Sequence, residues 1–461
     1  MSRAALLGIA LLVVGALIAL TAPVSSSLAL SIYFGRTIVA AHALPAVLGP
    51  QSFTAASSPW LAQGWLGAAV TSLVYAAGGY PALVAGNILL AGIAFVLVAE
   101  RCRAHRLSLT ATALALALAI LASLGTLCVG GATADLALAA AFLACLDRLS
   151  GRWLWAAVPL TLLWVNLSTI GLIAPLFALC ALVGALIEER VVTGRVRELL
   201  ALTLLLVVAA IATPAGVNAL TNYSAYLGFD SSGTLGGWQP ARVSAPALFA
   251  GLVPAMIFCA WLGLRRSGDP EEVAVSLAAI VLALLHGKYL GIAGLAVSPV
   301  LAAALDRVTM PSPQRAVPAL PSGGVAAALA LVALLGACVS FARGTQILDA
   351  GRDQYAAIDR LARDGRPHRL LCLNPSWCNY ALLRGAPSLQ VFFDGRQESY
   401  PQDVRDDFVT IVLGRPQWLR RVKSWNIDTV VTTPNGISLL ALLPQWHALS
   451  LRGNLVIYQR R

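Results

Sequence analysis

Residues 323–342 read GGVAAALALVALLGACVSFA, and residues 343–363 read RGTQILDAGRDQYAAIDRLAR. The first stretch has no charged side chain, whereas the second has seven. The chain therefore changes character near residue 344. Before this point it is a succession of apolar blocks with few charges, and the 118 residues from 344 to 461 have the polarity of an ordinary globular domain.

The composition excludes a single water-soluble globule. Of the 461 residues, 58% are hydrophobic, and the mean hydropathy is +0.78. One soluble core cannot enclose so much apolar surface, because the outside of the molecule would have to be apolar as well. We expect a polytopic α-helical membrane domain over residues 1–343 and a small C-terminal α/β soluble domain over residues 344–461.

A helix needs about 17 to 25 apolar residues to cross a bilayer. Runs of this size predict eleven spans, near 4–22, 81–99, 107–125, 132–147, 153–167, 169–187, 198–213, 246–264, 273–287, 289–305 and 323–342. We interpret 60–79 as an interfacial or re-entrant helix rather than a twelfth span. Residues 4–22 could also be a signal peptide, but no good small-x-small cleavage site follows them, so we expect a retained anchor.

The basic residues predict the orientation, since Lys and Arg beside a span resist translocation. With eleven alternating spans, thirteen arginines share one face and four basic residues (Arg36, Arg242, Lys288 and Arg343) fall on the other. This places the N-terminus in the cytoplasm and the C-terminal domain outside, which is the periplasm if the cell is Gram-negative. The long connections 23–80 and 214–245 then face outward. Functional residues usually lie in such long, irregular loops.

Short motifs are distributed along nearly the whole chain. They are Gly35-Arg36, Leu44-Pro45, Ser52-Phe53-Thr54, Pro59-Trp60, Trp65-Leu66, Trp164-Val165-Asn166, Trp238-Gln239-Pro240, Phe393-Asp394-Gly395-Arg396 and Tyr400-Pro401. In these motifs the chain resembles bacterial C-type (GT-C) glycosyltransferases that use a polyprenyl-phosphate sugar donor and carry a C-terminal extracytoplasmic domain. The resemblance implies an outward-facing cavity, with a carboxylate in the first outer loop for the acceptor and basic residues for the lipid phosphate.

The sequence departs from this pattern at the acids. No Asp or Glu occurs before Glu100. The resemblance implies acids near four positions and a histidine near a fifth, and all five are non-ionisable here: Ser27, Gly49, Gly64, Gly237 and Ser168. An acceptor hydroxyl is a poor nucleophile until a base takes its proton. The usual acid–base chemistry is therefore absent or has moved.

Asp135 is the remaining candidate for the catalytic base or a metal ligand, at the predicted outer start of a span. The alternative is an Asp in the first turn of a helix, where the macrodipole favours it. The outer acid Asp230 instead fits a turn. The substrate-binding candidates on the outer side of the membrane domain are Arg36, His42, Arg242 and Lys288, because a lipid phosphate needs cationic partners. For Arg36 and Lys288 the alternative is anchoring against lipid headgroups.

In the soluble domain, patterns predict helices over 353–363, 403–413 and 416–424, and strands over 369–373, 389–393, 429–432 and 455–459. Asp394 and Arg396 directly follow a strand, so they are further substrate-binding candidates. The alternative is an internal pair that fixes the turn. We expect a turn at Pro375 that helps bring Cys372 and Cys378 together. The two cysteines could form a disulfide in an oxidising compartment or stay unpaired.

Two functions remain open on the sequence alone. One is a membrane glycosyltransferase with a reduced or relocated active site, and the other is a non-catalytic relative that binds a glycan, lipid or partner protein. A transporter is less well supported, since no inverted repeat is evident. The expected partners are membrane lipids and a polyprenyl-phosphate sugar donor, but not nucleic acid. No Cys and His set has zinc spacing, so we assign no metal ligands, and no cofactor follows from the sequence.

Overall fold

The computed structural model describes residues 3–21, 27–60, 62–147, 152–221, 246–265, 268–309, 346–433, 443–450 and 455–460. The chain divides into two compact units. The helical unit comprises Met1–Pro23, Pro81–Tyr223 and Leu235–Ser340, and the mixed unit comprises Val24–Tyr80, Ser224–Thr234 and Phe341–Arg461. The predicted span 323–342 and the predicted functional residues Asp230 and Arg242 lie outside the described residues.

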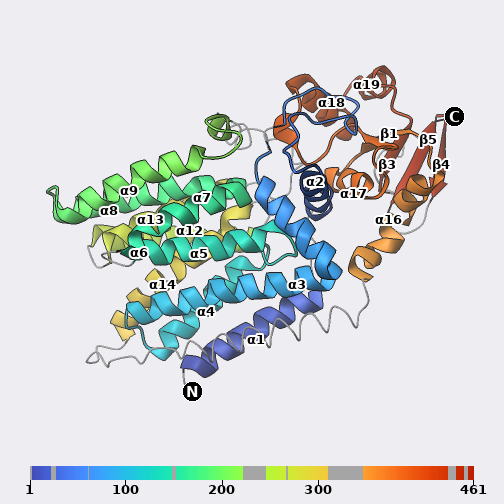
Figure 1. Ribbon diagram of the computed structural model, residues 1–461. Helices are drawn as coiled ribbons and strands as arrows, with labels where there is room; N and C mark the ends of the chain where they lie inside the picture. The colour runs from blue at the N-terminus through green and yellow to red at the C-terminus, as the bar shows by residue number, and fades with distance from the viewer. Residues whose placement is uncertain are drawn as a thin grey trace. The chain divides into compact units, whose positions relative to one another are not determined.

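Helices form at ten of the eleven predicted spans (Figure 1). The helical unit contains α1 (Arg3–Thr21), the second part of α3 (Trp65–Ala104), α4 (Leu109–Ser123), α5 (Gly131–Asp147), α6 (Arg152–Trp155), α7 (Ala157–Leu167), η1 (Thr169–Ile173), α8 (Ala174–Glu189), α9 (Gly194–Ile211), α12 (Pro246–Leu264), α13 (Pro270–Leu285), η3 (Gly287–Tyr289) and α14 (Leu290–Thr309). Three described helical segments are both long and apolar enough to cross a membrane: Trp65–Ala104, Thr169–Glu189 and Gly287–Asp306. The number of spans stays a prediction.

The 40 residues of α3 are interrupted at Gly78 and Gly79. Gly79 has φ 63° and ψ −154°, a combination that is open to glycine and strained for other residues. The boundary between the two compact units falls directly after this break, between Tyr80 and Pro81. The sequence predicted separate helices on the two sides of this point, which agrees with the break. The interfacial placement of the first helix stays a prediction.

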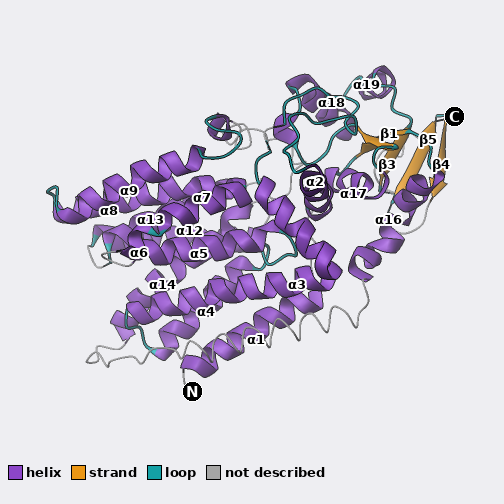
Figure 2. Cartoon of the chain, in the orientation of Figure 1, coloured by secondary structure: helices purple, strands orange, loops and turns teal. Residues whose placement is uncertain are grey.

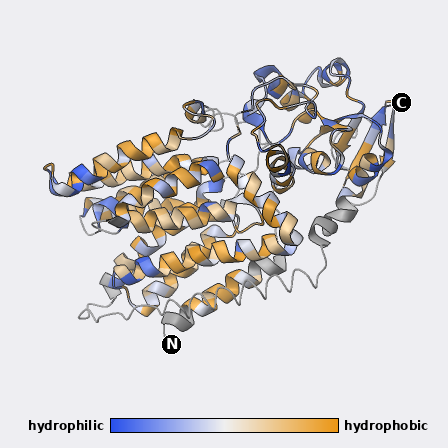
Figure 3. Cartoon of the chain, viewed as in Figure 1, coloured by the Kyte–Doolittle hydropathy of each residue, from blue (hydrophilic) through white to orange (hydrophobic). Residues whose placement is uncertain are grey.

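The helical unit exposes apolar side chains in the way that a lipid-facing surface does. On α9, Leu199, Leu202 and Leu206 are buried, yet Leu204 and Val208 are 61% and 60% exposed. Figure 3 shows the helices of this unit to be mostly apolar along their lengths. Helices that are apolar on both their inner and outer faces belong in a bilayer. The chain is thus a polytopic α-helical membrane protein.

The helices of this unit approach one another closely where small residues line the contact. Helix α14 packs against α4, α5 and α13. A Cβ atom at Gly291 would collide with Leu136 and with the hydroxyl of Thr126, and one at Gly294 would collide with Ala122. Such small residues are typical of tight packing between membrane helices. They bring the start of α14 against the start of α5, which is the region of the predicted site.

The mixed unit contains a small α/β domain with a mixed sheet, as predicted (Figure 2). Its elements are α2 (Leu28–Ala41), the first part of α3, α16 (Gln346–Asp364), β1 (His368–Cys372), α17 (Pro375–Gly385), β2 (Leu389–Val391), η4 (Gln397–Ser399), α18 (Gln402–Val412), α19 (Trp418–Ser424), β3 (Thr429–Thr432), β4 (Trp446–Ser450) and β5 (Val456–Arg460). The strand order is β2-β1-β3-β5-β4. Strands β2, β1 and β3 are parallel, and β5 and β4 continue the sheet in antiparallel fashion.

Helix α17 and strand β4 were not predicted. Where the sequence suggested a proline turn, Pro375 instead occupies the first turn of α17, and the Asn374 side chain caps that helix by accepting a hydrogen bond from the Ser376 amide. Proline fits a first helical turn because its missing N–H would have no partner there anyway. The disulfide Cys372–Cys378, left open by the sequence, joins the end of β1 to this helix.

The predicted outer loop 23–80 contributes to the core of the mixed unit. Leu30, Phe34, Leu48 and Trp60 belong to the same buried cluster as the strand residues of the sheet. The loop also adds to the sheet edge, where the amide of Val391 donates to the carbonyl of residue 51 at 2.8 Å. The compact unit therefore includes a segment that the predicted boundary near residue 344 assigns to the membrane domain.

Candidate functional site

Asp135 occupies a buried polar position in the helical unit. Its side chain is 4% exposed. The indole Nε1 of Trp164 donates to Oδ1 at 2.8 Å, and the hydroxyl of Ser168 donates to Oδ2 at 3.1 Å. Because α5 begins at Gly131, Asp135 lies beyond the first turn, and the alternative of a simple first-turn Asp does not describe it. The carboxylate is instead held by side chains from the end of α7.

The local sequence explains why Trp164 and Ser168 reach Asp135. Helix α7 ends at Leu167, and Ser168 turns into an extended conformation with φ −157°. Its hydroxyl also accepts a hydrogen bond from the amide of Ile170, the second residue of η1. A Cβ atom at Gly171 would collide with the backbone around Trp164, so glycine lets η1 fold back against α7. Ser168 is the position at which the resemblance implies a histidine.

Lys288 lies at the junction of α13 and α14, in η3. Its ammonium nitrogen is 4.8 Å from the centre of the Tyr289 ring and interacts electrostatically with the Asp135 carboxylate. The whole sequence contains only two lysines, Lys288 and Lys423. A lysine whose ammonium nitrogen is sealed from solvent, in a chain that mostly uses arginine, indicates a need for a compact charge. The structure thus brings together two of the predicted site residues.

This pair has the groups that acid–base and phosphate chemistry require. A carboxylate that accepts two hydrogen bonds still has free acceptor positions, one of which can take up a proton. An ammonium group in a low-dielectric region interacts strongly with an anion. The group of three potential metal ligands found among the described residues does not include Asp135, and a metal-ligand role for Asp135 stays a prediction.

Arg36 and His42 belong to the mixed unit and are both exposed. The Arg36 guanidinium lies 5.5 Å from the centre of the Tyr75 ring, on the helix that follows the loop. His42 ends α2 in a left-handed conformation with φ 49°. Neither belongs to the unit that holds Asp135 and Lys288. Their roles in substrate binding stay predictions.

Asp394 and Arg396 form a buried ion pair in the mixed unit. Their side chains are 0% and 4% exposed, and Arg396 Nη2 lies 2.6 Å from Asp394 Oδ2. Arg396 also donates through Nη1 to the carbonyl of Leu48 and lies 4.1 Å from the centre of the Phe34 ring. This is the internal pairing that the sequence left as the alternative. Substrate binding by the pair stays a prediction.

Comparison with solved structures gives matches over almost the whole chain. ArnT from Cupriavidus metallidurans bound to undecaprenyl phosphate matches with a TM-score of 0.52 at 15% identity, over 98% of this chain and 97% of that chain. The apo state of the same protein matches with a TM-score of 0.51 at 15% identity, over 95% of this chain and 93% of that chain. The chain has a GT-C-like fold. The apo form of the Archaeoglobus fulgidus oligosaccharyltransferase matches this GT-C-like protein with a TM-score of 0.52 at 13% identity. The match covers 94% of this chain and 69% of that chain. No protein-family model and no curated protein sequence matches the chain.

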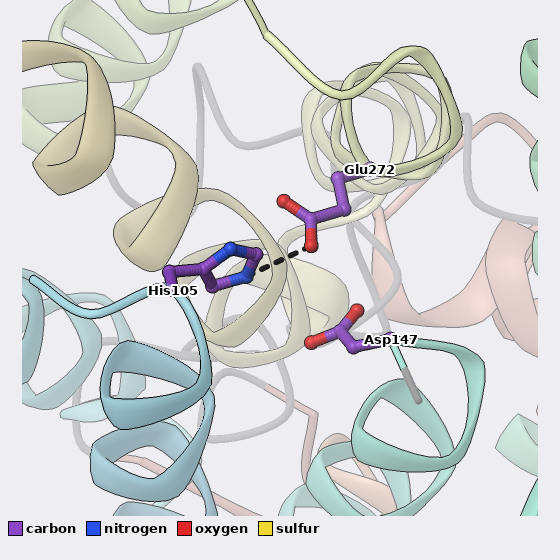
Figure 4. A group of neighbouring side chains, drawn as sticks. All are labelled: His105, Asp147 and Glu272. Carbon is purple, nitrogen blue, oxygen red and sulfur yellow. Dashed lines mark ion pairs between the residues drawn. The ribbon is translucent and has the colours of Figure 1, made fainter. Parts of the chain in front are cut away.

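Sequence reasoning missed one cluster of ionisable groups in this GT-C-like protein. His105, Asp147 and Glu272 lie together at the end of the helical unit where α3 and α5 finish and α13 begins (Figure 4). The close carboxylate of Glu272 raises the pKa of His105 above its usual value. Because the cluster is supplied by the residue after α3, the end of α5 and the start of α13, no local spacing could have revealed it.

Proposed function

We propose that this protein is a glycosyltransferase that takes a sugar from a polyprenyl-phosphate donor at the outer face of the bacterial inner membrane. The observation that supports it is the buried carboxylate of Asp135, which Trp164 and Ser168 hold by hydrogen bonds and which interacts electrostatically with the Lys288 ammonium group. The GT-C-like fold supports it as well, since the matching ArnT structure is bound to undecaprenyl phosphate. In this proposal the pair faces the extracytoplasmic side, as the distribution of arginines predicts.

The proposed reaction gives each group one role. The acceptor hydroxyl forms a bond to the anomeric carbon of the sugar and passes its proton to Asp135. The bond between that carbon and the lipid phosphate breaks, and its electron pair stays on the phosphate. Lys288 then stabilises the negative charge of the leaving group, which is where a preorganised cation contributes most. The donors Trp164 and Ser168 keep the carboxylate oriented.

The other predicted residues complete the proposed substrate path. Arg36 and Arg242 would contact the lipid phosphate or neighbouring headgroups, and His42 would contact the acceptor or sugar at the membrane surface. Asp394 and Arg396 would act on substrate through the loop that they hold, since both are buried and Arg396 donates to the carbonyl of Leu48.

A second candidate function is supported by a different observation. The first outer loop has no carboxylate, and the positions Ser27, Gly49 and Gly64, where the resemblance implies acids, have none. A non-catalytic relative that binds a lipid-linked glycan would need Lys288 and the outer cations but no base. Asp135 therefore separates the two functions.

The test uses the full-length protein and two readouts. Binding of undecaprenyl phosphate is measured by native mass spectrometry in detergent, and envelope glycans are profiled in a deletion strain complemented with each variant. Lys288→Met should weaken lipid binding about 10- to 100-fold, the loss expected for a hydrogen bond to a charged group. The control Lys423→Met changes the other, exposed lysine and should bind like the wild type.

Asp135→Asn is the discriminating variant, because it keeps the shape and one acceptor oxygen while removing the base. If the protein is the proposed transferase, this variant binds the lipid phosphate but no longer restores the glycan modification. A variant that binds and restores the wild-type glycan profile would exclude Asp135 as the base. A wild type that binds lipid without altering any envelope glycan would favour the non-catalytic function.

A further inference from the structure

Three ligand-type side chains converge at the end of the helical unit where Asp147 finishes α5. His105 follows α3, and Glu272 lies in the first turn of α13. One potential ligand atom from each residue lies within 4.8 Å of the other two. Figure 4 shows the imidazole and both carboxylates directed toward one another. Asp147 is 12 residues beyond Asp135 on the same helix, about 18 Å along its axis. The cluster is therefore separate from the Asp135 site.

Arg101 holds the carboxylate of Asp147 in place. Its guanidinium pairs with Asp147 through Nε and through Nη2, the latter at 3.3 Å from Oδ1. A third nitrogen, Nη1, donates to the carbonyl of Leu295 at 2.6 Å. A carboxylate offers about four acceptor positions, so this pairing leaves capacity on Asp147. An outer partner that holds a carboxylate in place is a common support for a metal ligand.

The charges around the cluster leave an excess of carboxylates. A small cavity of about 20 Å³ beside it is lined by Asp147, Asp269, Glu271 and Glu272, and also by Arg101. Arg195 pairs with Glu271 at 2.6 Å. These four acids and two arginines carry a formal charge of about −2 when His105 is neutral. A doubly charged cation balances that charge, and the cavity has room for about one water ligand.

The contact between His105 and Glu272 is close but misaligned. His105 Nε2 lies 2.8 Å from Oε1 of Glu272. This nitrogen is sealed from solvent, and the contact lacks the geometry of a hydrogen bond. Buried nitrogen atoms normally have an aligned partner. A cation placed between the imidazole and the two carboxylates would give all three groups such a partner.

We propose that His105, Asp147 and Glu272 bind a divalent transition-metal ion of the zinc or manganese type. Imidazole nitrogen together with carboxylate oxygens suits these ions, whereas magnesium and calcium prefer oxygen alone. Each ligand atom would stand about 2.0–2.2 Å from the ion, so the most separated pair moves together by about 1 Å. The bound ion joins the connection between α3 and α4 to α5 and α13.

The test measures metal content in the full-length protein purified in detergent. The protein is stripped with a chelator, equilibrated with Zn²⁺ or with Mn²⁺, desalted and analysed by inductively coupled plasma mass spectrometry. The wild type should retain one of these ions in stoichiometric amount. His105→Gln and Glu272→Gln should each lose it. His368→Gln removes a different histidine that also contacts a carboxylate, Asp364, and should keep the metal.

A ligand-exchange variant distinguishes loss of the metal ligand from loss of metal through misfolding. His105→Cys replaces one zinc ligand with another, so it should retain Zn²⁺ where His105→Gln does not. The folded state of each variant is checked by circular dichroism and gel filtration. The proposal is overturned if the wild type retains neither ion, or if its metal content survives both Gln substitutions. In either case the cluster is a network of ion pairs only.

Discussion

The guanidinium of Arg396 donates a hydrogen bond through Nη1 to the main-chain carbonyl of Leu48, 3.0 Å away and 348 positions earlier in the sequence. The same group pairs with Asp394 and lies over the rings of Phe34 and Trp60. One buried side chain thereby ties the predicted outer loop to the sheet of the C-terminal domain. The loop gains a fixed conformation from residues far along the chain.

Arg396→Met should destabilise the protein strongly. The substitution keeps much of the apolar stem but leaves Asp394 buried without its partner, which costs about 3–5 kcal/mol in comparable pairs. The measurement is denaturant unfolding of the full chain in detergent, followed by proteolysis within the loop. Arg384→Met is the control, because Arg384 is 53% exposed in its pair with Asp359 and should contribute less than about 1 kcal/mol. Equal effects of the two variants would contradict a structural role for the buried pair.

Trp164→Phe should destabilise the helical unit. It removes the donor to Oδ1 of Asp135, and a buried acceptor left without a partner costs about 1–3 kcal/mol. The measurement is the shift in the thermal unfolding midpoint in detergent. Trp155→Phe makes the same chemical change at a side chain that is 38% exposed, so it should shift stability by about 0.5 kcal/mol or less. A neutral Trp164→Phe would mean that the hydrogen bond to Asp135 contributes nothing to stability.

The membrane helices could be predicted because each satisfies its own backbone within one apolar run. The same local logic located the helix break before Pro81 and most elements of the C-terminal domain. It also selected Asp135 and Lys288 as single residues. It could not show that they interact, since α5 and the junction of α13 and α14 meet only through packing.

The remaining features depend on contacts between distant segments. The loop around Leu48 looks like an irregular outer connection in sequence, and only its packing reveals that it belongs to the core of the mixed unit. Helix α17 was missed because proline is favoured both in turns and at the start of a helix, and the local sequence around Pro375 does not distinguish the two. The cluster of His105, Asp147 and Glu272 draws on three helices, so its members resemble ordinary charges at helix ends.

The disulfide gives a test of the predicted orientation. Disulfides form and persist in oxidising compartments. If the C-terminal domain lies outside the inner membrane, Cys372 and Cys378 are oxidised in protein isolated from cells. Denatured protein treated with a maleimide–polyethylene glycol reagent should then gain two modified cysteines only after reduction. Cys102, in the predicted cytoplasmic connection, is not part of a disulfide in the structure and serves as the control that reacts without reductant. Modification of Cys372 and Cys378 without reduction would contradict the predicted location.

Asp364 should make stability depend on pH in the acid range. Partial burial alone would raise the pKa of its carboxyl, but hydrogen bonds from the Arg366 amide and the His368 ring outweigh this and lower it. A carboxyl with a depressed pKa contributes stability above its unfolded value, about 3.9, and loses the contribution as pH falls through the folded value. The difference between the wild type and Asp364→Asn should therefore shrink below about pH 4.

The effect of Asp364 should be small, because its side chain is 37% exposed and the charge is screened by solvent and salt. Denaturant unfolding of the full chain is compared for the wild type and Asp364→Asn between about pH 3 and pH 6, at low and high salt. Asp403→Asn removes an exposed carboxylate elsewhere in the mixed unit and serves as the control. Parallel pH profiles for the wild type and Asp364→Asn would show that His368 and the Arg366 amide do not favour the charged carboxylate.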